Sequence, residues 1–96
     1  MHAFRVQVIA GDGHPKFPMG FDSDGIVVVD SRDYDEAWRL ASRRLIELGW
    51  SGVEVKGAIL LPEEPDASTL SPQMRKAISM ARDLTVAFVA YPQKAT

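Results

Sequence analysis

The stretch from Asp33 to Gly49 constrains the fold most, because it carries the clearest helical periodicity in the chain. On a wheel of 3.6 residues per turn, its apolar residues fall on one stripe and its charged residues fall opposite. The stripe consists of Tyr34, Ala37, Trp38, Ala41, Leu45 and Leu48, with Leu40 at its edge. This pattern predicts an amphipathic helix of about four turns with one core-facing side. Ile46 alone breaks the pattern, so it either meets a second layer or is exposed.

Both ends of this helix are marked in the sequence. Asp33 and Glu36 have the spacing of a capping box, in which side-chain oxygens accept hydrogen bonds from backbone N–H groups without helical partners. Gly49 follows the last periodic residue, where a left-handed backbone closes a helix most easily without a side chain. We therefore predict a helix that begins near Tyr34 and ends before Gly49.

Other segments have the patterns of β-strands. Alternating apolar and polar residues predict strands with one solvated face at Ala3–Ala10 and Val53–Leu61, the second with a bulge at Gly57. Ile26–Asp30 is a run of β-branched residues, typical of a strand buried on both faces. The valines and aromatic residues of Leu84–Tyr91 favour a strand, although part of this segment is also spaced to continue a preceding helix.

A second helix is predicted after Ser71, because a serine cap followed by Pro72 in the first turn is a typical helix start. Its apolar face consists of Met74, Ala77, Ile78 and Ala81. The acidic, proline-containing segment Pro62–Thr69 predicts an exposed connection, and Pro92–Thr96 a frayed tail.

The element order β-β-α-β-α-β predicts an α+β sandwich of two layers, with both helices on one face of a four-stranded, mostly antiparallel sheet. Ninety-six residues suffice for one domain, residues 1–96, with one core. The other face then carries the polar residues Arg5, Gln7, Glu54 and Lys56. Because the second and fourth strands are apolar on both sides, we expect an apolar stripe on that face. A homodimer through this face, or through the edge of the last strand, follows as a hypothesis.

Composition excludes several classes of protein. With 46% apolar and 25% charged residues, the chain is an ordinary globule. It has neither a run of about eighteen apolar residues nor a signal peptide, so we expect a cytoplasmic protein without membrane contact. The absence of cysteine excludes disulfides, thiolate catalysis and cysteine metal sites. A net charge of -2 gives no indication of nucleic acid as a partner, and no cofactor is expected.

Catalytic motifs are weak. His14, two residues after Asp12, is either a general base in a glycine-rich loop or a solvated loop residue. No histidine spacing suits a metal, and Gly11-Asp12-Gly13 lacks the third glycine and the following helix of a phosphate-binding loop. No serine lies in a Gly-x-Ser-x-Gly elbow. The sequence therefore favours a protein that is not an enzyme.

Charged residues gather in two places. The first helix and its approach carry Arg32, Arg39, Arg43 and Arg44. Carboxylates lie among these arginines at helical spacing, which favours a solvated face over nucleic-acid binding. The acidic residues are Asp22, Asp24, Asp30, Asp33, Asp35 and Glu36. They match no calcium loop, and either stabilise the helix N-terminus or form a charged contact surface.

The segment Gly11–Gly25 is predicted to be a long loop with unusual apolar content. Phe17, Met19 and Phe21 would each cost about 1.5 to 3 kcal/mol if left in water. They either form a satellite core over the end of the sheet or anchor the loop in a partner protein, with Lys16, Asp22 and Asp24 as a polar rim. Trp50, next to Gly49, has the same two interpretations.

From these features we predict a small, non-enzymatic protein-binding module. It would act by occluding a partner protein, as immunity-type and phage-encoded inhibitors of bacterial enzymes do. The long loop is its expected binding element. A small enzyme or ligand-binding protein that uses the same loop is the alternative, and nucleic-acid binding through the first helix is the third hypothesis.

Overall fold

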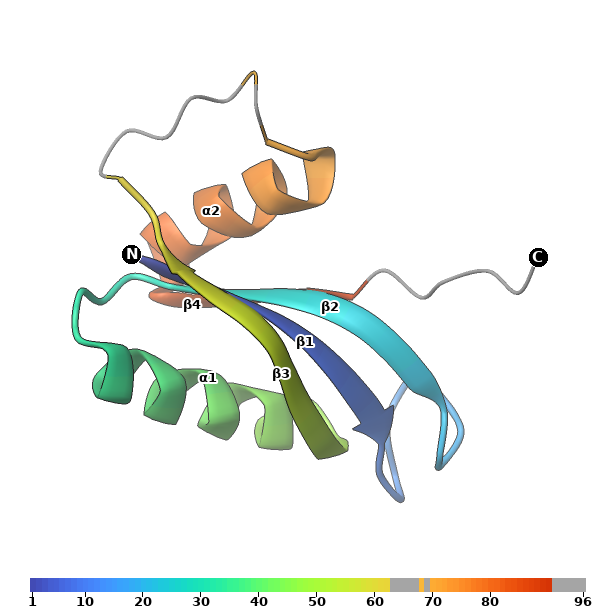
Figure 1. Cartoon of the computed structure of the whole chain (residues 1–96). Coiled ribbons are helices and arrows are strands. Elements are labelled where there is room, and N and C mark those ends of the chain that lie inside the picture. Colours follow the sequence, from blue (N-terminus) through green and yellow to red (C-terminus); the bar gives the residue numbers. More distant parts are fainter. Residues whose placement is uncertain (63–67, 69, 91–96) are drawn as a thin grey trace.

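The computed structural model describes residues 1–62, 68 and 70–90 (Figure 1). Its elements are β1 (His2–Ala10), β2 (Asp22–Val29), α1 (Tyr34–Glu47), β3 (Trp50–Leu60), α2 (Pro72–Leu84) and β4 (Val86–Ala90). The predicted α+β class and element order are confirmed, and the ambiguous last segment contains a strand. The predicted tail, residues 92–96, and most of the predicted connection 62–69 lie outside the described residues.

The four strands form one antiparallel sheet in the order β3-β1-β2-β4. The central strands β1 and β2 pair along their whole length, with Phe4 opposite Val27. β3 and β4 are the two edges. β3 follows β1 with two shifts in register, and the first lies where Gly57 and Val55 pair with consecutive residues of β1. This irregularity is the bulge that the glycine in the strand predicted.

The two helices lie on opposite faces of the sheet, so the prediction that both cover one face is wrong (Figure 1). The core under α1 contains Val27 and Val29, whereas the core under α2 contains Ile26 and Val28. Successive residues of a strand point to opposite faces, so an apolar run such as β2 needs a cover on each side. The expected apolar stripe exists, but α2 packs on it.

The ends of both helices agree with the sequence. The Asp33 side chain accepts a hydrogen bond from the Glu36 backbone N–H at 3.0 Å, and Gly49 follows α1 with φ +98°. Ser71 caps α2 in the same way, accepting from the Met74 N–H at 3.1 Å.

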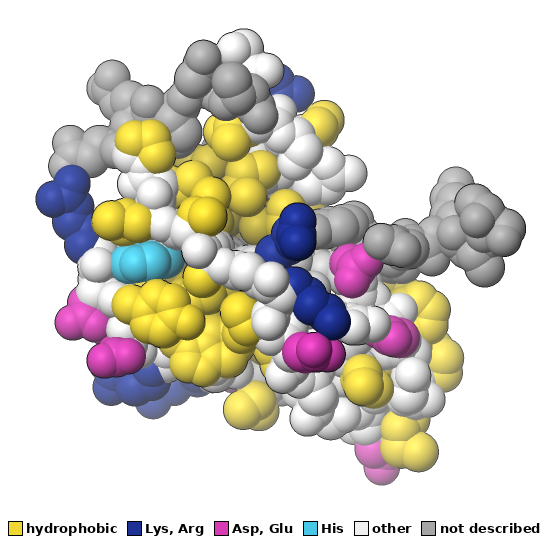
Figure 2. All heavy atoms as spheres, viewed as in Figure 1, with side chains coloured by type: hydrophobic (Ala, Val, Ile, Leu, Met, Phe, Trp, Pro, Cys, Tyr) yellow, Lys and Arg dark blue, Asp and Glu magenta, His cyan; other side chains and the backbone are white. Residues whose placement is uncertain are grey.

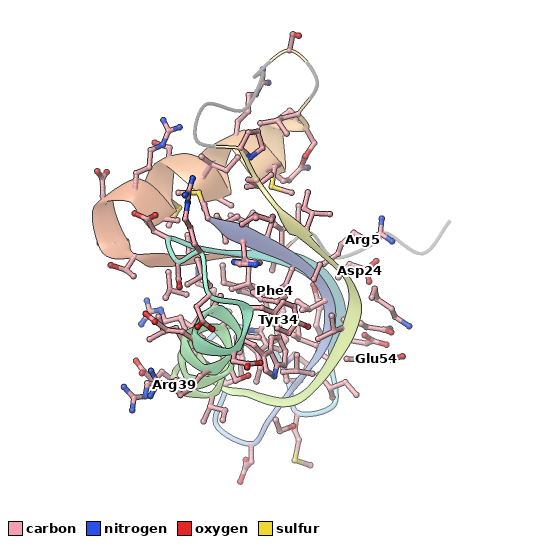
Figure 3. The ribbon with its side chains drawn as sticks, turned by 60° about the vertical axis from the view of Figure 1, so that its left-hand side comes forward. Phe4, Arg5, Asp24, Tyr34, Arg39 and Glu54 are labelled. Carbon is pink, nitrogen blue, oxygen red and sulfur yellow. The ribbon has the colours of Figure 1, made fainter. Side chains whose placement is uncertain are left out.

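The predicted stripe of α1 faces the core, with its middle residues Ala37, Ala41 and Leu45 fully buried. At the start of the helix Tyr34 is half exposed, with its ring 5.6 Å from that of Phe4 (Figure 3). Ile46, the exception to the pattern, is 69% exposed.

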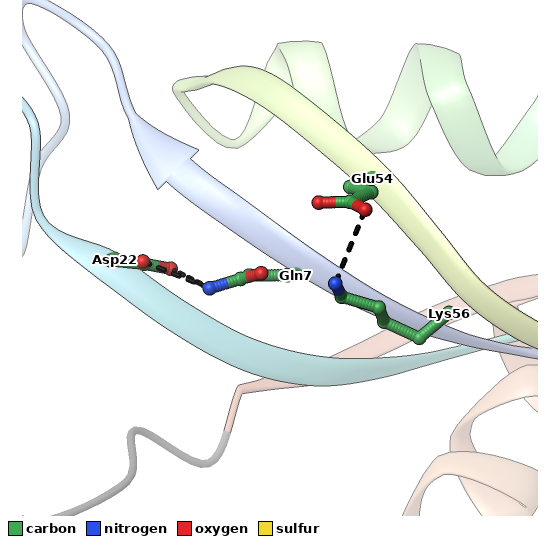
Figure 4. Close-up of polar contacts among 4 residues, drawn as sticks. All are labelled: Gln7, Asp22, Glu54 and Lys56. Carbon is green, nitrogen blue, oxygen red and sulfur yellow. Dashed lines mark hydrogen bonds and ion pairs between the residues drawn. The ribbon is translucent and has the colours of Figure 1, made fainter.

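The face of the sheet on the α2 side is polar where α2 does not cover it. Arg5, Asp24 and Glu54 project from this face, away from α1 (Figure 3). The Gln7 amide donates to both carboxylate oxygens of Asp22 at 2.9 Å, and Lys56 pairs with Glu54 at 3.1 Å (Figure 4). Figure 2 shows side chains of both charges interspersed over the middle of the surface that has β3 in front. The predicted polar residues therefore share a face.

Candidate functional site

The loop between β1 and β2 runs from Gly11 to Phe21 and is shorter than predicted, because β2 begins at Asp22 rather than at Ile26. The start of β2 is polar, since it pairs with the polar part of β1, Gln7 opposite Asp24. Charged and small residues are poor strand formers on average, and here the pairing with β1 overrides that preference.

The loop is closed by hydrogen bonds at both its base and its centre. At the base, the Ala10 N–H donates to the Phe21 carbonyl and the Gly20 N–H to the Ala10 carbonyl, both at 2.8 Å. At the centre, His14 Nδ1 accepts from the backbone N–H groups of Lys16 and Phe17 at 3.0 and 3.2 Å. A general base needs a free lone pair, and the lone pair of His14 Nδ1 already accepts these two hydrogen bonds. His14 therefore closes the loop.

The loop is anchored on the turn after α1. The Gly11 N–H donates to the Gly49 carbonyl at 2.8 Å, and the His14 and Trp50 ring centres are 4.4 Å apart. A Cβ on Gly49 would lie 3.0 Å from the His14 ring. Glycine at this position thus serves both the positive φ and the close approach of the loop.

Aromatic rings connect the loop to β4. Phe17 and Phe21 stack with ring centres 4.5 Å apart and an interplanar angle of 7°, and Phe17 lies 5.8 Å from Trp50. Trp50 in turn meets Phe88 of β4 edge-on at 5.8 Å. Such offset and edge-on pairs each add about 0.5 to 1.5 kcal/mol beyond area burial. Phe17 and Phe21 therefore form a satellite of the core, which leaves open whether they also contact a partner.

The six residues predicted as a binding site separate into two groups. Phe17 and Phe21 pack on the core, while Lys16 lies exposed beside them and Met19 is 74% exposed. Asp22 and Asp24 belong to β2 and lie with the polar face, where Asp22 is held by Gln7. Their role in binding stays a prediction.

Two cavities lie along β4, and together we call them the β4 groove. One, of about 370 Å³, is lined by loop residues including His14, Lys16 and Phe17, by Leu48 and Trp50, by Lys76 and Met80 of α2, and by Phe88–Ala90. The other, of about 510 Å³, is lined by Leu40, Arg43, Arg44, Glu47, Leu84, Thr85 and Val86. Sequence spacing could not reveal Phe88 and Lys76 as neighbours of the loop, because only the fold brings β4 and α2 beside it.

The lining of the groove is mainly apolar, with several cationic side chains. Its described lining combines apolar side chains with four cationic ones, and Glu47 is its single carboxylate. Paired carboxylates or a nucleophile beside a base, which acid–base and covalent catalysis need, do not occur in this lining. Among the described residues no cluster of three metal-ligating side chains forms.

The arginines of α1 differ in their surroundings. Arg39 points outward from the helix (Figure 3), whereas Arg43 and Arg44 line the groove. Arg44 also pairs with Glu47 one turn on, at 3.6 Å. Of the carboxylates that the sequence places among the arginines, Glu47 is thus shown beside one of them.

Comparisons with protein-family models, with curated proteins and with solved structures found no match to this chain. Within the part of the chain that the structure describes, no helix is long and apolar enough to cross a membrane.

Proposed function

We propose that this chain is a small non-enzymatic protein-binding module that inhibits a partner by occluding it. The observation that carries the proposal is the placement of the loop 11–21. Its aromatic residues are held by Trp50 and the core, and it forms one wall of the β4 groove. A rigid loop loses little conformational entropy on binding, and aromatic, methionine and arginine side chains are enriched in protein interfaces. Occlusion suits a chain without catalytic side chains in its groove.

Met19 is the cleanest probe of the loop, because at 74% exposure its substitution cannot remove much core packing. We expect Met19→Ser combined with Lys16→Ser to weaken partner binding by at least about 2 kcal/mol, as substitutions of interface anchors do. The unfolding midpoint should stay near that of the wild type. Phe17 and Phe21 are poor probes, since their removal would lower the stability of the free protein as well.

The experiment has two stages. Tagged wild-type protein is purified from the source cell with everything bound to it, and the bound molecules are identified by mass spectrometry. The affinity of the recovered protein is then measured by calorimetry for the wild type and for the double variant. A stoichiometric protein partner that binds the variant more weakly is the expected result. Recovery of only small molecules or nucleic acid would overturn the proposal.

A ligand-binding function is the second candidate, and the size of the cavity beside the loop favours it. Its volume of about 370 Å³ is within the range of small-molecule sites, and its lining is mostly apolar. A ligand that fills this cavity should raise the unfolding midpoint of the wild type. Trp50→Phe, which reshapes the lining, should reduce that shift.

The homodimer expected from the sequence remains a hypothesis. α2 covers the apolar half of the face that was expected to be open, so the edge of β4 is the remaining route. Light scattering at micromolar concentration distinguishes a monomer from a homodimer, because the measured mass of a single chain excludes a dimer under those conditions.

A further inference from the structure

We infer that the β4 groove binds an extended, acidic segment of a partner protein, which adds to β4 as a further strand of the sheet. The inference rests on the proposed function, because it names the kind of partner and the surface that such a module would use.

The first observation is an unoccupied sheet edge. Within the described residues β4 pairs only with β2. The Asp30 N–H donates to the Thr85 carbonyl at 2.8 Å, which fixes the alternation of the antiparallel ladder. Ala87 and Val89 then direct their backbone groups toward β2. Val86, Phe88 and Ala90 direct theirs to the open side, where an added strand pairs.

The second observation is that this edge has no charge, proline or bulge to block strand addition. β4 has the sequence VAFVA, with no charge, no proline and no break in its register with β2. Natural proteins protect an edge with charges, prolines or bulges, or by keeping the edge strand very short, and of these β4 has only its short length. Without charges, prolines or bulges the edge is available for pairing, and main-chain pairing of this kind is a common mode of peptide recognition.

The third observation is that the two cavities lie one after the other along this edge. β4 has only five residues, so main-chain pairing alone offers few bonds and side chains must contribute. The two cavities together extend from Val86 to Ala90, and a strand of about five residues spans roughly 17 Å. On the α1 side of the added strand lie Leu40 and Leu48, and on the α2 side lies Met80. Alternate residues of an added strand would meet these apolar walls.

The charges that line the β4 groove indicate what kind of segment would bind there. Lys16, Arg43, Arg44 and Lys76 line the groove against the single carboxylate of Glu47, although the whole chain has a net charge of -2. A second copy paired edge to edge would bring two such cationic grooves together, which complementarity disfavours. A segment with apolar residues in its centre and carboxylates at its ends matches both the apolar walls and the cationic rim.

The test uses synthetic peptides as probes, measured by fluorescence anisotropy at low salt. The acidic probe alternates valine and threonine and ends in glutamates. One control replaces the glutamates by lysines, and another carries N-methyl groups on the alternate amides that would pair with β4. We expect the acidic probe to bind at least about tenfold more tightly than either control. Salt should weaken its binding, because charge contributes to it.

Two variants locate the site on the protein. Ala90→Pro removes an outward N–H group, a position where an edge strand tolerates proline, and should weaken the acidic probe at least about tenfold. Lys16→Glu combined with Lys76→Glu should reverse the preference toward the lysine probe. Arg75→Glu is the matched control, because Arg75 is exposed on α2 but lines neither cavity, and it should leave affinity within about twofold. If Ala90→Pro fails to fold, the N-methylated probe still tests the backbone pairing.

Four results would overturn the inference. Equal binding of the N-methylated probe excludes strand addition, and equal binding of the lysine probe excludes the acidic preference. A dimer that Ala90→Pro dissociates would assign the edge to a second copy. An oligonucleotide that displaces the acidic probe and binds more tightly would show that the cationic side chains of the groove bind nucleic acid instead.

The proposed function fails separately from this inference. Suppose that a natural protein partner is recovered and binds both groove variants with wild-type affinity. That result would support the protein-binding function and contradict the strand-addition site at β4. If no protein is recovered while the acidic probe binds as expected, the groove is a peptide site but the inhibitor function falls.

Discussion

The two edge strands of this sheet, β3 and β4, differ in length, regularity and charge. β3 is eleven residues long, shifts register against β1 twice and carries the paired charges of Glu54 and Lys56. β4 is five residues long, regular and uncharged, and an aromatic side chain at its centre packs against the core. Bulges and charges oppose strand addition, and β3 has both, whereas β4 has only its short length to limit pairing. This difference is the reason why we propose strand addition at β4 rather than at β3.

The largest effect is expected from the aromatic residue of β4. Phe88→Ala should lower the free energy of unfolding by about 3 kcal/mol, because it removes the contact with Trp50 and leaves a cavity. Val55→Ala is the matched change at the other edge, where the side chain is 38% exposed, and should cost about 1 kcal/mol or less. Urea unfolding of both variants measures the difference. Equal losses would contradict the view that β4 is packed into the core more tightly than β3.

Glycines near the two edges should respond in opposite ways. A Cβ on Gly25 would clash with the Phe88 ring, so Gly25→Val should cost about 2 kcal/mol by forcing β2 and β4 apart. Apart from its chain neighbours, no described residue has a heavy atom within 4 Å of a Cβ on Gly57. Valine also favours strands, so Gly57→Val should be neutral or slightly stabilising. Thermal unfolding of the pair decides. Destabilisation by Gly57→Val would mean that the bulge of β3 requires glycine.

The two helices that wall the β4 groove should depend equally on their caps. Asp33→Ala and Ser71→Ala each remove a side-chain acceptor for a first-turn N–H, and each should cost about 1 kcal/mol. Asp33→Asn and Ser71→Thr keep an acceptor and serve as controls. An unchanged urea midpoint for one alanine variant would show that its helix begins elsewhere.

The smallest effect on stability is expected at the charges of β3. The Glu54–Lys56 pair is exposed, so replacing both residues by threonine should change the free energy of unfolding by less than about 0.5 kcal/mol. The same change removes the charges that protect this edge, so the variant should self-associate more readily, measured by light scattering at increasing concentration. A variant that stays monomeric at every concentration would show that the bulges alone protect β3.

Much of the secondary structure could be predicted because its signals are local. The cap at Asp33, the glycine after α1 and the Ser71-Pro72 start of α2 are each set by a few adjacent residues. The start of β2 was predicted four residues late, since its polar residues become a strand only by pairing with β1. The apolar residues of the loop were recognised, although the sequence did not tell that Phe17 and Phe21 stack on each other.

The sequence by itself determined the elements and their order, and it showed that β2 is apolar on both faces. It did not determine that the second apolar face receives α2, nor that β4 lies at an edge with Phe88 beside Trp50. Periodicity is a property of a few neighbouring residues, whereas strand order and the face that a helix covers depend on which distant segments pack together with the lowest free energy. For that reason alone, side chains from the loop 11–21, from both helices and from β4 line the β4 groove.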